Sequence, residues 1–127
     1  MTPEAAIAML NRQLAAHGQD IRLTRNTLGP GGVLIPFSVE CRAFVRSYKA
    51  DELVGGIIQG DTLVVLAPTE IEAQGWPGAE VTPTNQDRRV PRKDDKCVIA
   101  GKSRNVEAGT PFYLNGELVR IELQVRG

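Results

Sequence analysis

The amino-acid sequence predicts a mainly-β protein, a small antiparallel β-barrel or sandwich with one N-terminal α-helix and two long loops. After residue 18 the apolar residues recur with a period of two, as in strands that bury one face. Turn signals divide this region into five or six short stretches. The 127 residues and the 42% apolar fraction suit one domain, 1–127, with one core.

The helix is expected over residues 1–18. Thr2 can cap its first turn, and Pro3 suits the first helical position because that position needs no N–H donor. Gly18 is a natural end. Apolar side chains at spacings of three and four form one face: Ile7, Leu10 and Leu14.

The barrel is expected over residues 19–127. Residues 28–32 are predicted to be a loop, because one Pro and three Gly lie close together there. Asn115-Gly116 is the strongest hairpin signal, and Leu118-Val119-Arg120 leaves room for a register irregularity in the closing strand. The stretches with strand patterns are 20–25, 38–46, 62–67, 97–100, 103–108 and the one containing Ile121, Leu123 and Val125.

Two segments lack a clear strand pattern and are expected to be long loops, at about 47–60 and 69–93. The first places four aliphatic residues among glycines: Leu53, Val54, Ile57 and Ile58. Either they cap the barrel from a short helical turn, or they form an arm that buries them against another subunit. Trp76, in the second loop, is a further candidate partner contact.

The charges cancel overall, with 15 basic and 15 acidic residues, so no strong global field attracts nucleic acid or anionic lipid. A local basic run interrupts the second loop: Arg88, Arg89, Arg92 and Lys93. These side chains either contact DNA phosphates without reading sequence, or belong to a solvated loop that nearby aspartates neutralise.

Candidate catalytic or ligand-binding groups are few. His17 fits the last turn of the helix, where the helix dipole favours a cation. Cys41 and Cys97 lie in alternating apolar stretches without the spacing of a metal site. We therefore expect a protein that is not an enzyme and holds no cofactor or metal. The start of the chain lacks a signal-peptide pattern and no apolar run reaches membrane-spanning length, so a soluble, cytosolic protein without a membrane partner is expected.

Residues 90–101, 104–108 and 116–127 form a basic, Asp-containing turn, a strand and Gly turn, a further strand, and a last strand ending in Leu-Gln-Val-Arg-Gly. This order resembles the ending of head-closure proteins of long-tailed bacteriophages, also called head–tail joining, neck or stopper proteins. The strands at 20–25 and 39–46 and the segment 48–60 are also similar to that family.

The resemblance implies a virion structural protein that is assembled in the cytoplasm of the bacterial host. Such proteins form a homo-oligomeric ring that closes the DNA-filled head below the portal and adaptor proteins. The ring offers an attachment surface to the tail terminator or tail tube. The two long loops would then contact neighbours or narrow the channel, and the basic run would face the packaged double-stranded DNA.

Two alternatives remain open. One is a neighbouring neck component such as a tail terminator. The other is a small-barrel nucleic-acid-binding module, which would need aromatic side chains for base stacking beside basic residues. The candidate aromatic residues are few, and Phe44 is alone in sharing a strand with Arg42 and Arg46. An enzyme is the third choice.

Overall fold

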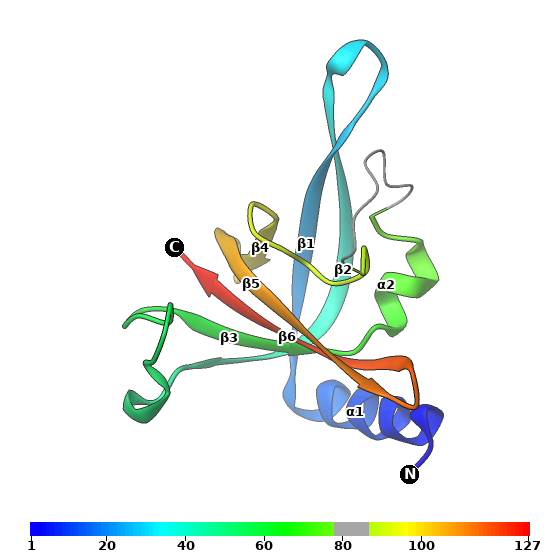
Figure 1. Ribbon diagram of the computed structural model, residues 1–127, viewed down its shortest axis with the longest axis vertical. Coiled ribbons are helices and arrows are strands. Elements are labelled where there is room, and N and C mark those ends of the chain that lie inside the picture. Colours follow the sequence, from blue (N-terminus) through cyan, green and yellow to red (C-terminus); the bar gives the residue numbers. More distant parts are fainter. Residues whose placement is uncertain (78–86) are drawn as a thin grey trace.

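The computed structural model describes residues 1–77 and 87–127, and they form a closed antiparallel barrel with one long helix outside it (Figure 1). The barrel order is β1-β2-β3-β6-β5-β4. The mainly-β class and the N-terminal helix predicted from sequence are confirmed. The strands are β1 (Gln19–Leu28), β2 (Leu34–Ser47), β3 (Thr62–Leu66), β4 (Lys96–Ile99), β5 (Lys102–Leu114) and β6 (Glu117–Arg126).

Helix α1 (Pro3–His17) has the predicted ends. The Thr2 hydroxyl accepts a hydrogen bond from the Ala5 N–H at 3.1 Å, and the Gly18 N–H donates to the Leu14 carbonyl at 2.8 Å. Gly18 is extended, so it is not needed for a positive φ. A Cβ at this position would lie 2.7 Å from the Ala43 carbonyl oxygen, so close backbone approach to β2 requires the glycine.

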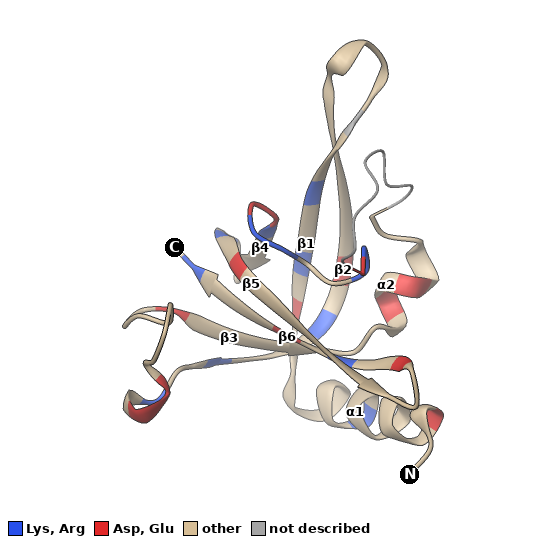
Figure 2. Cartoon of the chain, viewed as in Figure 1, with Lys and Arg blue, Asp and Glu red and all other residues tan. Residues whose placement is uncertain are grey.

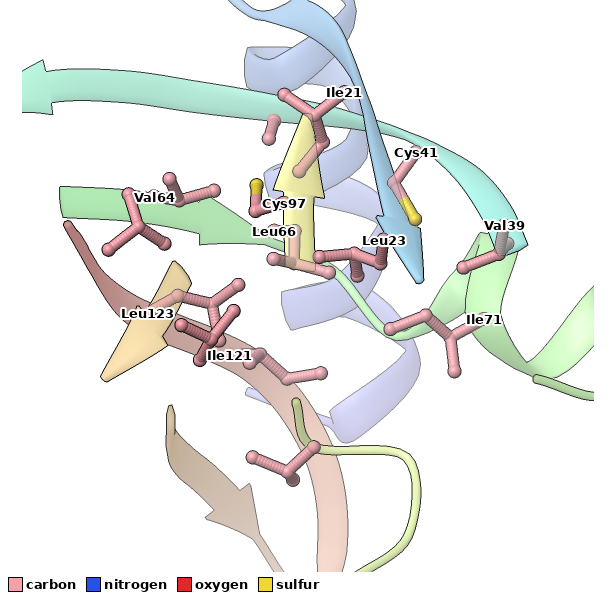
Figure 3. Packing of buried hydrophobic residues seen from close by; sticks show 14 of the residues in the cluster. Ile21, Leu23, Val39, Cys41, Val64, Leu66, Ile71, Cys97, Ile121 and Leu123 are labelled. Atoms are coloured by element: carbon pink, nitrogen blue, oxygen red, sulfur yellow. The ribbon is translucent and has the colours of Figure 1, made fainter. Parts of the chain in front are cut away.

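The core consists mainly of inward-facing side chains of the six strands, joined by Ile71, Trp76 and Val90 from the segments between β3 and β4 (Figure 3). Val39, Cys41 and Ala43 point inward, as their alternation predicted. Cys41 and Cys97 are buried free thiols, and burial raises the pKa of each thiol to about 12. A second, smaller cluster packs α1 onto the outer face of β3: Leu10, Leu14, Leu63, Val65 and Ala67.

The hairpin between β5 and β6 follows its sequence signal. Asn115 and Gly116 both have positive φ, which the turn requires. The pairing of Phe112 with Arg120 is followed by that of Tyr113 with Leu118, so Val119 is skipped and the predicted irregularity in β6 is present.

Two predicted loops differ from the structure. The loop predicted at 28–32 lies at 29–33 and contains a 3-10 turn (Pro30–Gly32), and the strands beside it are longer than predicted, because β1 and β2 pair as far as Leu28 and Leu34. The 69–93 loop contains helix α2 (Thr69–Gln74), whose Ile71 is fully buried in the core. The first loop, 47–60, contains a 3-10 turn (Ala50–Glu52). Residues 78–86 of the second loop lie outside the described residues.

Candidate functional site

The basic residues singled out in the sequence lie in the segment that precedes β4, which we call the basic segment (residues 87–95). Figure 2 colours both basic (blue) and acidic (red) residues on this segment, which leads into β4. Arg88 and Lys93 are exposed, whereas Arg89 and Arg92 are half-buried. The structure thus brings the four cations together on one short segment without exposing them equally.

A buried ion pair holds the basic segment against the barrel. The Arg25 guanidinium of β1 donates from Nε to Asp95 Oδ1 at 3.0 Å and from Nη2 to Asp95 Oδ2 at 2.8 Å. Both side chains are about 5% exposed. Removing two charges from water is costly unless they are paired and hydrogen-bonded, as this two-point geometry allows.

The same guanidinium also organises the backbone around it. Arg25 donates to the carbonyl oxygens of Arg88 at 3.1 Å and of Val90 at 3.2 Å. The other end of the pair acts similarly, since Asp95 Oδ2 accepts from the Arg92 N–H at 2.9 Å. We call Arg25, Asp95 and these bonded groups the Arg25 hub. It fixes both ends of the basic segment to one strand.

Trp76 belongs to this hub and not to a partner surface, so its prediction as a partner contact is wrong. It is 1% exposed. Its ring centroid lies 4.7 Å from the Arg25 guanidinium carbon, a cation–π distance, and its Nε1–H donates to the Phe37 carbonyl at 2.8 Å. The physical reason is that the large ring and its one donor are both satisfied inside the chain.

A close backbone approach adds to the anchoring of the basic segment. A Cβ at Gly109 of β5 would collide with the Pro91 carbonyl oxygen. The absence of a side chain at Gly109 lets the basic segment lie directly on the strand. Residues of this segment and of β5, among them Tyr113, also line a cavity of about 480 Å³.

Arg89 is occupied by acidic partners of its own chain. Its guanidinium contacts Asp87 at 2.7 Å and Glu72 of α2 at 3.1 Å. The hydrogen bond from Arg89 lowers the pKa of the Asp87 carboxyl to about 2, and Tyr113 donates a further bond to the same carboxylate. Of the four predicted DNA contacts, the exposed Arg88 and Lys93 are therefore the best placed to meet a phosphate.

The aliphatic segment (residues 48–60) is anchored to the barrel at both ends. Near its start, Glu52 accepts two hydrogen bonds from Arg46 at 2.8 and 2.9 Å. At its end, the fully buried Asp61 carboxylate accepts from Arg126 of β6 at 2.8 and 2.9 Å and from Gln124 at 2.8 Å. These contacts hold the segment beside β6.

The four aliphatic residues of this segment divide into two pairs. Leu53 and Ile57 are half-buried, as expected for residues that cover the barrel end. Val54 is 66% exposed and Ile58 is 52% exposed. Leu53 and Ile57 thus fit the interpretation of residues that cap the barrel, and Val54 and Ile58 fit that of an arm. The surface offered to a partner has two exposed aliphatic residues and not four.

An exposed apolar patch was missed in the sequence. It lies at the far end of the β1–β2 hairpin, where Val33 and Leu34 are 62% and 61% exposed and Ile35 and Phe37 are also accessible. The signal was the apolar run that directly follows the Gly-rich turn. The turn signal alone does not indicate that the two flanking strands extend beyond the barrel.

The Arg25 hub yields a prediction for stability. Asp95→Asn leaves the buried guanidinium without its counter-charge and should lower the free energy of unfolding by about 3–5 kcal/mol, measured by urea denaturation. Glu40→Gln removes the exposed partner of Arg22 and should change it by at most about 1 kcal/mol. Equal losses in the two variants would contradict the role given to the hub.

The buried Asp61 predicts an acid-sensitive component of stability. Hydrogen bonds from Arg126 lower its pKa in the folded chain from 3.8 to about 2. The folded state therefore gains stability above pH 4 and loses it as the pH falls toward 2, by about 2 kcal/mol. In urea titrations between pH 4 and pH 2, Asp61→Asn should flatten this loss, whereas the exposed control Asp51→Asn should not. If the free energy of unfolding of Asp61→Asn falls with pH as steeply as that of wild type, this account is excluded.

The described residues also bear on metal binding and on membrane insertion. In residues 1–77 and 87–127, no three His, Cys, Asp or Glu side chains are grouped to hold a metal ion. No helix of the described chain has the length and apolar character to span a membrane. Neither a family model nor a curated protein matches this sequence. The best-defined features are thus the basic segment on its hub and the exposed apolar residues of two projecting segments.

Proposed function

We propose that this chain is a virion structural protein at the head–tail junction of a tailed bacteriophage. Copies of it form a ring that closes the DNA-filled head, with portal or adaptor proteins on one side and a tail terminator or tail tube on the other. The observation that carries the proposal is a closed barrel with exposed aliphatic side chains on two segments that extend from it.

The physical argument concerns what such a shape is suited to. Closing the barrel pairs the strand edges with one another, so the scaffold resists edge-to-edge aggregation while its projecting segments stay available. Exposed aliphatic groups gain stability when another protein covers them. A rigid body with separate apolar contact points suits a ring component that has neighbours on several sides.

The C-terminal residues that carry the family resemblance occupy one continuous part of the barrel, and the other similar strands, 20–25 and 39–46, belong to β1 and β2. Residues 96–99, 102–114 and 117–126 are the neighbouring strands β4, β5 and β6. The basic turn before them is the segment that the Arg25 hub holds. This arrangement supports the proposal because the similar stretches form one structural unit. A tail terminator remains a close variant of the same function.

A first prediction concerns the aliphatic segment in phage particles that incorporate the chain. Replacing Val54 and Ile58 together with Asp should weaken docking at least about 100-fold, because carboxylates would be desolvated at the interface. Filled heads without tails should accumulate in electron micrographs, and infectivity should fall.

The matched control is Gln59→Asp, which adds a charge to the same segment without removing an aliphatic group. It should leave particle assembly near normal. Immunogold labelling of the C-terminus should locate the wild-type chain at the neck of the particle. Complete particles with the double variant, or a chain that is absent from purified particles, would refute the proposed function.

A second prediction concerns DNA. If Arg88 and Lys93 face the packaged duplex, wild-type protein should bind arbitrary double-stranded DNA weakly, with an affinity that falls as salt rises. The variant Arg88→Gln/Lys93→Gln should reduce the slope of log affinity against log salt by about 2. An unchanged slope would show that Arg88 and Lys93 do not contact DNA phosphates.

The nucleic-acid-binding alternative rests on one observation. Tyr113 is 50% exposed and lines the same cavity as Arg92 and Lys93, so an aromatic face lies beside cations. Tight, sequence-tolerant binding of single strands that is lost in Tyr113→Ala would favour this alternative over the ring.

A further inference from the structure

The outer part of the β1–β2 hairpin stands apart from the rest of the barrel. β4 pairs with β1 only from Ile21 to Thr24, and β3 pairs with β2 only from Ala43 to Ser47. Residues 26–37, which we call the hairpin tip, therefore form a two-stranded ribbon. Figure 1 shows it extending away from the other strands. An isolated ribbon of this kind is only marginally stable in water, so a covering surface would stabilise it.

The chemistry of the hairpin tip is uniform. None of its twelve residues is charged, and Figure 2 shows neither blue nor red on its described part. Its exposed large side chains are Val33, Leu34, Ile35 and Phe37. A contiguous exposed aliphatic group is unusual on a monomeric protein and marks a contact surface. The complementary surface must be apolar and carry no unpaired charge.

Among the described residues, a surface on the outside of the barrel comes near this requirement, although charged side chains line it beside the apolar ones. Two cavities of about 340 and 330 Å³ lie side by side on the outer face of β2, β3 and β6, and both are lined by Phe44, Val65 and Arg120. One extends to Leu10 and Leu14 of α1, and the other to Ile57 of the aliphatic segment. We call the two cavities together the outer groove. Phe44, which lines both, is 39% exposed.

The charges around the outer groove are already paired within the chain. Arg46 contacts Glu52 at 2.8 Å, and Arg120 contacts Glu122 at 2.9 Å. A nucleic acid or an acidic peptide would have to break these pairs to gain a contact. An uncharged aliphatic segment would not. The outer groove thus combines its apolar lining with two ion pairs, and an uncharged hairpin tip can dock without breaking either pair.

The tip cannot reach the outer groove of its own chain. Figure 1 shows the tip and α1 at opposite ends of the longest axis, and α1 borders the outer groove. We infer that the hairpin tip of one copy docks into the outer groove of a second copy. Because the two surfaces differ, each copy can use them with two different neighbours, and such head-to-tail contacts give a ring when the rotation between copies closes.

This inference deepens the proposed function, on which it rests for the expectation that copies assemble into a ring. It is tested on the purified full chain by sedimentation velocity over rising concentration. Wild-type protein should form dimers and larger species. Leu34→Asp in the tip and Phe44→Asp in the outer groove should each lower the association constant at least about 100-fold. Circular dichroism should show both variants folded, because both side chains are exposed.

Mixing the two variants gives the sharpest result. Phe44→Asp keeps an intact tip and Leu34→Asp keeps an intact groove, so an equimolar mixture should form a one-to-one dimer and nothing larger. Phe112→Asp is the matched control: it replaces an aromatic residue of similar exposure, 41%, that lines neither cavity. It should associate like wild type.

Three results would overturn the inference: a wild-type chain that stays monomeric at millimolar concentration, variants that associate like wild type, or a mixture that forms no dimer. A Phe44→Asp variant that associates like wild type while Leu34→Asp stays monomeric would indicate a symmetric tip-to-tip contact instead. The proposed function fails separately. A chain that associates head-to-tail but is absent from phage particles refutes the head–tail role alone, and a neck protein without tip-to-groove association refutes this inference alone.

Discussion

The buried pair of Arg25 and Asp95 determines how the non-barrel parts of the chain are placed. Arg25 projects from β1, and Asp95 ends the segment that leads into β4. The guanidinium also donates hydrogen bonds to two backbone carbonyl groups, and it lies over the Trp76 ring. Planar, five-donor geometry makes arginine suitable for this, and lysine could not replace it. One side chain thus couples the base of the hairpin, the basic segment and the chain that follows α2.

Barrel closure and the hub together separate rigid from projecting parts. Four of the six strand pairs that close the barrel are short. The β5–β6 pair is longer and β6 lies against α1, whereas the long β1–β2 pair continues beyond the core. The aliphatic segment projects from another side and is tied down by Asp61. Contact surfaces held on a firm base lose little conformational entropy when a partner binds.

Elements with local signals could be predicted from sequence. The cap at Thr2 and the turn at Asn115-Gly116 each depend on residues within a few positions of one another. The burial of Trp76 could not be predicted, because its partner Arg25 is distant in the sequence and an arginine in an alternating strand normally faces water. Of the acidic partners of Arg89, Asp87 is one of the nearby aspartates expected from the sequence, whereas Glu72 could not be predicted because it reaches Arg89 only once α2 has formed. The glycines at 29–32 indicated a turn correctly, yet gave no information on how far the flanking strands extend beyond the core.

The buried Asp61 has a mechanical consequence. Its carboxylate is bonded to two side chains of the last strand, and the Gly56 carbonyl of the aliphatic segment accepts from those same two side chains, Gln124 and Arg126. A force applied to the aliphatic segment is therefore transmitted into β6, a strand that is hydrogen-bonded on both sides, to β3 and to β5. A component that bears tension between two larger bodies gains resistance to rupture from such a connection.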